Sequence, residues 1–230
     1  MSSLTPVVRA RWRDIDRLVN LVTATVSATP LAAWLVPDEG RRAAVLAGTT
    51  RIWTEHALLF GDAFLLRDGS AATVWFHRYR PIPLPVRYAD RLTETCGDDR
   101  DRFLLLDRAL AARRPTVPHH HLAVLAVAPG PERDARAGAA LAGAQRWMDT
   151  LGLPTYAEAG TKAQRDLYRR HGYADGEEFA LPDGTTTRPM WRLAPFGTGR
   201  AGATVIPYRR PAGGRWTNRR NARVTGWASR

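Results

Sequence analysis

Three consecutive histidines, His119, His120 and His121, come directly before an apolar run. An imidazole exchanges a proton close to neutral pH, so any one of the three could serve as an acid or base. If the run is a strand, His119 and His121 share one face and His120 lies on the other. Adjacent strand residues cannot all converge on one ion, and no acidic partner is evident, so the cluster is a poor metal site. The candidate chemistry is proton transfer, and the alternative is a structural or solvent-facing role.

The apolar run leads into a turn and an alanine-rich segment, which together read LAVAPGPERDARAGAALAG from Leu125 to Gly143. A strand followed by a turn and a helix that opens through glycine is a common way to bind phosphate, because free N–H groups and the helix dipole favour an anion. Here Glu132, Arg133, Asp134 and Arg136 occupy positions where such loops prefer glycine. Two interpretations stay open: a phosphate site, or a plain connection.

Periodicity and turn residues predict the elements that would position these groups. We expect helices over residues 10–28, 37–59, 88–112 (interrupted near 96–98), 134–151 and 161–171, and strands over 62–77 (a hairpin), 121–127, 154–159 and 173–193 (a pair). The hairpin prediction depends on Asp68-Gly69 between two apolar runs. Antiparallel pairs joined to strand–helix units predict an α/β fold with a mixed, mostly antiparallel central sheet and helices on both faces.

Three segments in this order resemble the GNAT superfamily of acyl-CoA N-acyltransferases. HLAVLAVAP is similar to the family's central strand, and ERDARAGAALAGAQRWMDTLGLP to its pyrophosphate loop and following helix. YAEAGTKAQRDLYRRHGYA is similar to the family's next strand and helix with its LYxxxGF ending. Residues 122–193 carry nearly all of the resemblance, and the N-terminal half agrees in layout only.

The resemblance implies a site for acetyl-CoA as the acyl donor. The residues that it implies for the cofactor are Leu125, Ala126, Val127, Arg133, Ala135, Arg136, Ala137, Gly138, Ala139 and Gln164. In this family the strand pairs with the pantetheine amides as an added strand would, and the loop amides face the pyrophosphate. The chain departs from the family pattern at two positions, because Arg136 stands where the middle glycine is expected and Asp134 replaces a small residue.

The resemblance also implies the reacting groups. Tyr168 matches the tyrosine that protonates the departing thiolate. His121 and His119 precede the central strand, where relatives place groups that face the acceptor, and either could be the base. Glu158 ends a strand beside the expected cleft and could meet the amine of a small-molecule acceptor. Glu55 and His56, on the second predicted helix, are expected on its solvated face.

Composition bounds the remaining possibilities. The net charge is +12, yet residues 194–230 contain eight arginines and no acidic residue, so residues 1–193 carry only +4. We therefore expect one GNAT-like domain over residues 1–195 and an Arg/Gly-rich tail over 196–230.

The single Cys96 excludes an internal disulfide. No apolar run approaches a membrane span and no secretory signal is recognisable, so a cytoplasmic location is expected.

Three function classes follow. The leading hypothesis is an N-acetyltransferase that uses acetyl-CoA and a small-molecule amine. The alternative is a protein of the same fold whose divergent loop has lost the cofactor and which serves a different reaction or ligand. A nucleic-acid partner, bound through the arginine-rich tail with Trp216 and Trp227 for stacking, is the least favoured class because the tail contains no defined motif.

Overall fold

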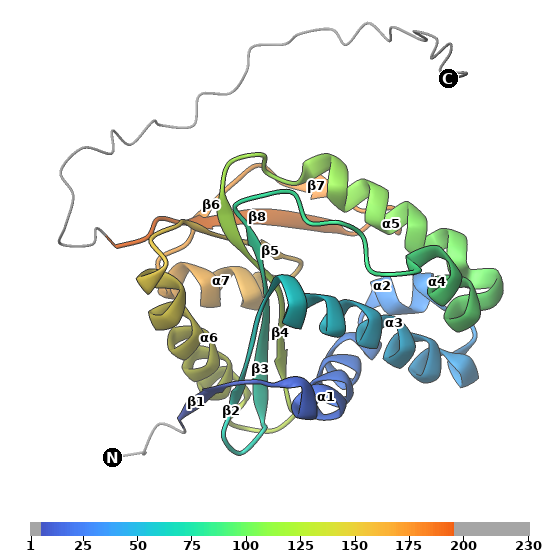
Figure 1. Cartoon of the computed structure of the whole chain (residues 1–230), viewed down its shortest axis with the longest axis horizontal. Helices are drawn as coiled ribbons and strands as arrows, with labels where there is room; N and C mark the ends of the chain where they lie inside the picture. Colours follow the sequence, from blue (N-terminus) through green and yellow to red (C-terminus); the bar gives the residue numbers. More distant parts are fainter. Residues whose placement is uncertain (1–5, 196–230) are drawn as a thin grey trace, which may run out of the picture. The chain divides into compact units, whose positions relative to one another are not determined.

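One eight-stranded sheet organises residues 6–195, the part of the chain that the computed structural model describes (Figure 1). The strands are β1 (Val7–Arg9), β2 (Gly61–Leu66), β3 (Ala71–Arg78), β4 (His119–Val127), β5 (Thr155–Ala159), β6 (Ala174–Asp175), β7 (Phe179–Ala180) and β8 (Thr186–Arg192). The helices are α1 (Ile15–Ser27), α2 (Pro30–Leu35), α3 (Glu39–Phe60), α4 (Tyr88–Cys96), α5 (Arg100–Arg113), α6 (Arg133–Thr150) and α7 (Lys162–Arg170), with 3-10 turns at Trp12–Asp14 and Gly97–Asp99.

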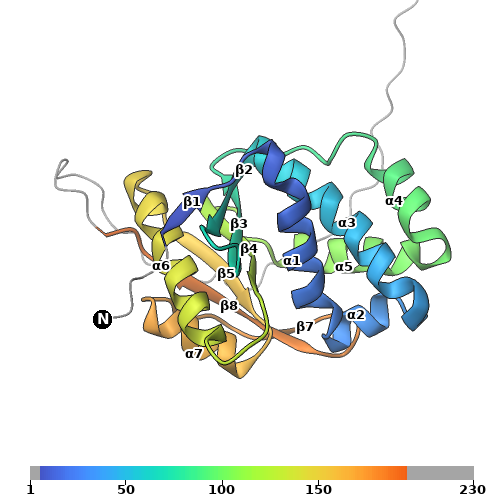
Figure 2. The same ribbon diagram turned by 90° about the horizontal axis from the view of Figure 1, so that it is seen from below.

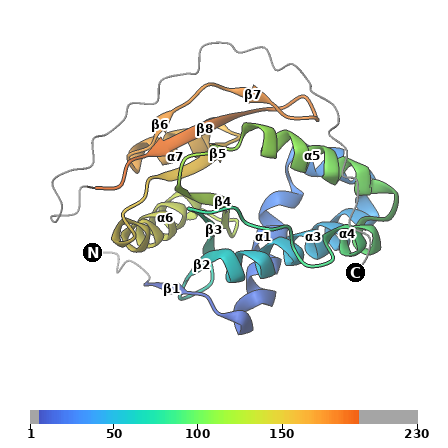
Figure 3. The same ribbon diagram turned by 45° about the horizontal axis from the view of Figure 1, so that its top comes forward.

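The strands lie in the order β1-β2-β3-β4-β5-β8-β6, with β7 beside β8. Strands β4 and β5 are parallel, and the other described pairs are antiparallel. Helices α1 and α3 share a buried cluster with one face of β2–β4, and α6 and α7 share another with the opposite face (Figure 2 and Figure 3). The predicted mixed, mostly antiparallel sheet with helices on both faces is confirmed.

Local signals explain why several elements end where they do. Gly69 adopts a φ of 74° in the β2–β3 hairpin, as the Asp-Gly dipeptide predicts. The break near residues 96–98 is confirmed, since α4 ends before Gly97, whose φ is 56°. Thr161 caps α7 by accepting a hydrogen bond from the Gln164 amide at 3.2 Å. Gly172, with a φ of 86°, follows the end of α7 as the predicted left-handed residue.

The N-terminal half differs from the sequence prediction in two places. The first α-helix begins at Ile15 and not at Ala10, because residues 7–9 form the edge strand β1. The helix α2 was not predicted, since the Thr29-Pro30 dipeptide indicated only a stop. In the structure Thr29 accepts a hydrogen bond from the Ala32 amide and Pro30 occupies the first helical position, so the same dipeptide ends α1 and starts α2.

The parallel pair β4–β5 separates along its length. Its residues pair from His120 with Thr155 to Leu122 with Ala157, after which β4 continues to Val127 without this partner. On the other side, the β3–β4 register shifts by one residue at Ala123, and Ala123 is exposed although most of β4 is buried. The bulge turns β4 away from β5, and we call the resulting separation the β4–β5 gap.

The predicted tail, residues 196–230 with Trp216 and Trp227, lies outside the described residues. None of the helices within residues 6–195 combines the length and the apolar character needed to cross a bilayer.

Candidate active site

The edge of β4 that faces the gap carries two of the predicted cofactor-binding residues. Ala128 donates its amide to Ser70 beside β3 at 2.8 Å, so alternation turns the backbone of Ala126 towards β3 and those of Leu125 and Val127 towards the gap. The Val127 amide donates to the Thr25 hydroxyl of α1 at 3.1 Å. Leu125 therefore presents backbone groups to the gap, while those of Ala126 belong to the β3 ladder.

The start of α6 presents two further amides. The Arg133 amide donates to the Gly130 carbonyl at 3.2 Å and the Arg136 amide to the Glu132 carbonyl at 2.9 Å. The amides of Asp134 and Ala135 lie between them in the first helical turn, where no carbonyl of the preceding turn is available. Both residues are exposed. This helix end can therefore receive an anion through N–H groups and the helix dipole.

The Arg136 side chain folds back over this helix end. Its Nη2 donates to Glu132 Oε2 at 3.4 Å, and a Cβ atom added at Gly130 would lie 3.6 Å from its Nη1. The arginine thus occupies part of the space that a glycine would leave free. Since the guanidinium is held by one exposed, long ion pair, little free energy opposes its movement towards a stronger anion.

The other predicted cofactor residues lie deeper in the fold. Ala137 is buried, and Gly138 and Ala139 follow it more than one turn into α6, where their amides bond within the helix. A Cβ at Gly138 would lie 3.4 Å from His171 Nε2, so this glycine faces the end of α7. The Gln164 side chain accepts a hydrogen bond at 3.0 Å from the amide of Gly160, the residue before the N-cap Thr161, and so supports the start of α7.

A histidine–glutamate pair lies where β4 and β5 separate. His121 Nε2 donates to Glu158 Oε2 at 2.7 Å, and Glu158 immediately follows Ala157, the last residue of β5 that pairs with β4. We call these two residues the His121–Glu158 pair. Their side chains are 11% and 19% exposed, so solvent still reaches them. Arg78 Nε, at the end of β3, lies 3.4 Å from His121 Nδ1.

The protonation of the pair follows from its surroundings. Burial acts to raise the pKa of Glu158, but the opposing effects of His121 and Tyr156 together hold that pKa below its ordinary value. The carboxylate therefore stays charged and keeps the His121 proton on Nε2. Burial and the charge of Glu158 raise the pKa of Tyr156. In this tautomer Nδ1 of His121 is a hydrogen-bond acceptor, and Arg78 Nε donates to it at 3.4 Å.

Tyr168 is a buried phenol on α7, and the charge of Glu158 affects its pKa. It is 2% exposed, and its ring lies 5.5 Å from that of Tyr173. Burial, and then the nearby Tyr173 and Glu158, raise the pKa of Tyr168. The phenol thus remains a proton donor at neutral pH. The charge of Glu158 thus acts on Tyr168, and its carboxylate accepts the hydrogen bond of His121. The assignment of Tyr168 and His121 as the reacting groups stays a prediction.

His119 lies on the same face as His121 but is a core residue. Its Nδ1 donates to the Val117 carbonyl at 2.7 Å, and its ring lies 5.5 Å from that of Trp191. Burial lowers its pKa to about 4, so the ring is neutral at physiological pH. His56 is also buried, and its Nε2 lies 2.9 Å from the Pro83 carbonyl. The prediction that His56 lies on a solvated helical face was therefore wrong, because the segment after β3 covers this residue.

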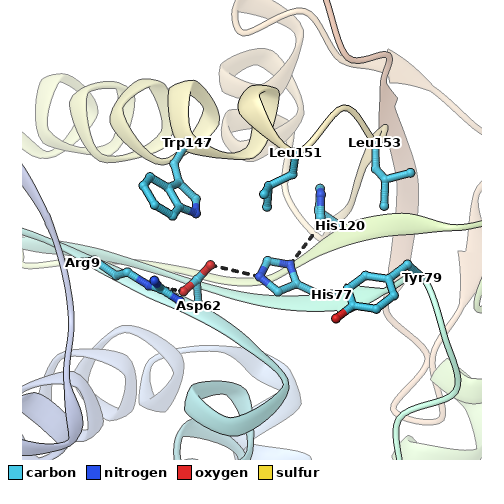
Figure 4. A pocket seen from close by; sticks show the side chains of 8 residues that line it. All are labelled: Arg9, Asp62, His77, Tyr79, His120, Trp147, Leu151 and Leu153. Carbon is cyan, nitrogen blue, oxygen red and sulfur yellow. Dashed lines mark hydrogen bonds and ion pairs between the residues drawn. The ribbon is translucent and has the colours of Figure 1, made fainter.

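His120 points to the opposite face of the sheet, where it belongs to a chain of hydrogen-bonded side chains that line a cavity (Figure 4). Its Nδ1 lies 2.8 Å from His77 Nδ1, His77 Nε2 donates to Asp62 at 2.9 Å, and Asp62 pairs with Arg9. The cavity has a volume of about 300 Å³, and Tyr79, Trp147, Leu151 and Leu153 complete its walls. This cavity lies on the other face of the sheet from His121, and no pattern in the sequence pointed to it apart from His120 itself.

No three His, Cys, Asp or Glu side chains among the described residues converge as a metal ion would require. Sequence reasoning missed Thr25 and Arg78, which contact β4 and His121 from elements distant in the chain. It also missed Arg114, whose charge acts on Glu158. Strand alternation in β3 would have placed Arg78 on the face of His121, but only the three-dimensional pairing of β3 with β4 puts the two side chains together.

No protein-family model matches the chain. Among solved structures, it is similar to a protein from Corynebacterium glutamicum described as histone acetyltransferase HPA2 and related acetyltransferase, with 21% identity, 84% of this chain and 98% of that chain covered, and a TM-score of 0.64. An agmatine N-acetyltransferase shares 18% identity over 81% of this chain and 98% of that chain, with a TM-score of 0.59. The polyamine N-acetyltransferase of Drosophila melanogaster shares 20% identity over 81% and 98%, with a TM-score of 0.56.

These similarities establish the fold. The chain has the GNAT acetyltransferase fold over nearly the full length of those structures, which confirms the fold that the sequence resemblance implied.

Proposed function

We propose that this protein transfers an acetyl group from acetyl-CoA to the amine of a small molecule. The observation that carries the proposal is the β4–β5 gap, with unpaired backbone along β4, an open helix N-terminus at one end and the His121–Glu158 pair with Tyr168 at the other. The fold neighbours named as acetyltransferases of agmatine and polyamines support the same reaction class.

The donor would lie along the gap. The backbone of Leu125 would pair with the pantetheine amides as a neighbouring strand does. The amides of Asp134 and Ala135 would receive the diphosphate at the start of α6. Arg136 would leave Glu132 and turn to the diphosphate, where two negative charges offer a stronger charge-assisted bond than one exposed carboxylate. Arg133, exposed at the same helix end, adds a second cation.

The reacting groups would divide the proton transfers. The acceptor's ammonium group would displace the 3.4 Å contact of Arg78 Nε with His121 Nδ1 and give its proton to Nδ1, while Glu158 holds Nε2 and stabilises the imidazolium that forms. The free amine attacks the thioester carbonyl, a C–N bond forms, and the C–S bond then breaks. Tyr168 donates its proton to the departing thiolate and regains one from solvent. His121 returns to the neutral state by releasing its proton to solvent, and the nitrogen of the new amide releases its second proton there as well. His119 keeps its core position and does not meet the substrate.

Two substitutions test this assignment. Tyr168→Phe removes the proton donor and keeps the ring, so kcat should fall at least tenfold while the Kd for acetyl-CoA, measured by calorimetry, stays within twofold. His121→Gln should likewise lower kcat, because it removes the proposed base. Unchanged kcat in both variants would remove these residues from the mechanism.

The competing function, a repurposed fold without a cofactor, has one observation in its favour, which is the Arg136 side chain over the helix end. Calorimetry separates the two. Binding of acetyl-CoA at micromolar to submillimolar concentration supports the transferase, whereas no heat at millimolar acetyl-CoA supports the repurposed protein.

A further inference from the structure

Two arginines beside the His121–Glu158 pair have guanidinium groups without a protein anion. Arg78 ends β3 and Arg114 follows the last residue of α5, and both are partly buried. Arg78 uses its Nε on His121, and its two terminal nitrogens make no hydrogen bond or ion pair with a described residue. The Arg114 guanidinium makes none either.

The nearby carboxylates are engaged elsewhere. Glu158 accepts from His121, and Asp107 of α5 accepts from the Tyr88 hydroxyl. Arg114 precedes His119, the cross-strand partner of Arg78, by five residues. Its charge acts on Glu158, Asp107, Tyr156 and Arg78.

A partly buried guanidinium loses hydration, and this loss is normally offset by a carboxylate or phosphate. Here burial, and then repulsion from Arg114, lower the pKa of Arg78 to about 10. Two cations that repel each other are stabilised when an anion binds to both.

We propose that the acceptor is an amino acid, a molecule whose amine lies one or two carbons from a carboxylate, and that Arg78 and Arg114 bind this carboxylate. The inference rests on the proposed transferase function and names its substrate class. The guanidinium fork matches a carboxylate in a bidentate arrangement. Because Arg78 also touches His121 Nδ1, a carboxylate on its terminal nitrogens places the adjacent amine beside the atom that takes its proton.

The same charges disfavour an acceptor that carries a second cation in place of the carboxylate. Such a molecule would bring its positive group against two guanidinium groups that already repel each other. Selection for amino acids would therefore use both attraction and repulsion.

The test compares matched acceptors that differ only in the carboxylate: arginine with agmatine, tryptophan with tryptamine, and phenylalanine with phenethylamine. Thiol release from acetyl-CoA gives kcat/KM, and calorimetry gives the Kd of each acceptor without any transfer step. We expect the carboxylate member of at least one pair to have the higher kcat/KM by roughly tenfold or more, the factor expected for a charged hydrogen bond.

Arg114→Gln should reduce kcat/KM for that amino acid by roughly tenfold to a hundredfold and leave or improve that of its amine counterpart. Arg108→Gln is the control, since it removes the same charge from an exposed position of the same helix and should change neither. The inference would be overturned, and the transferase function kept, by either of two results. One is a higher kcat/KM for the amines than for the amino acids. The other is an equal loss of kcat/KM for amino acids and amines in Arg114→Gln. Binding of amino acids without transfer would retain the inference and contradict the transferase, and neither binding nor transfer would overturn both.

Discussion

Acidification should destabilise this protein because two adjacent histidines are buried in the neutral form. His119 and His120 are 0% and 1% exposed. Burial lowers the pKa of each from 6.5 to about 4. The unfolded chain thus binds more protons than the folded one between these values. The contribution of the two neutral histidines to stability is fully present above pH 6.5 and is lost as the pH falls towards 4.

The expected loss follows from these values. Linkage gives about 2 kcal/mol per histidine between pH 7 and pH 5, hence about 4 kcal/mol for the pair, a large share of a typical domain's stability. Urea unfolding followed by tryptophan fluorescence at the two pH values measures it. The double variant His119→Phe, His120→Asn removes both titrating rings, and its asparagine retains a donor for His77.

The comparison between wild type and this double variant is diagnostic. His56 and His171, whose pKa values burial also lowers, remain in both proteins and contribute equally. The wild type should lose about 4 kcal/mol more than the variant between pH 7 and pH 5. Equal losses in the two proteins would refute the reasoning, because the titration would then reside in other groups.

Three further substitutions probe the gap and its supports. Glu132→Gln releases Arg136 from its ion pair, so calorimetry should show acetyl-CoA binding two- to tenfold more tightly; weaker binding would mean that Glu132 serves the site. Thr25→Val removes the acceptor of the Val127 amide and should lower the unfolding free energy by about 1 kcal/mol. The affinity for acetyl-CoA should not fall, since the freed amide faces the gap. An unchanged free energy of unfolding would contradict the assigned hydrogen bond. Gly69→Ala forces a side chain onto a φ of 74° and should cost about 1–2 kcal/mol in urea unfolding, whereas a neutral result would show that the hairpin relaxes.

Features that depend on neighbours in the chain could be predicted from the sequence. The Asp68-Gly69 turn, the Thr161 cap and the Gly172 ending each depend on a few adjacent residues, and all three are observed. The Arg136–Glu132 ion pair could also have been found, because the two residues stand four apart at the start of a predicted helix.

Features that depend on tertiary pairing could not be predicted. How far β4 and β5 run together is set by the bulge at Ala123 and by the helices on each face, and no local residue pattern specifies it. The approach of Arg114 to Arg78 likewise joins the end of α5 to the end of β3. Sequence identified the histidines and the tyrosine as reactive types, and the fold determined that His121 meets Glu158 whereas His119 becomes part of the core.

Amide hydrogen exchange with and without acetyl-CoA tests the central claim, that the donor occupies the β4–β5 gap. Millimolar acetyl-CoA should slow exchange in peptides that cover residues 123–136 and leave the β2–β3 hairpin, residues 61–78, unchanged. Identical exchange over residues 123–136 at saturating acetyl-CoA, or protection confined to other segments, would contradict the account.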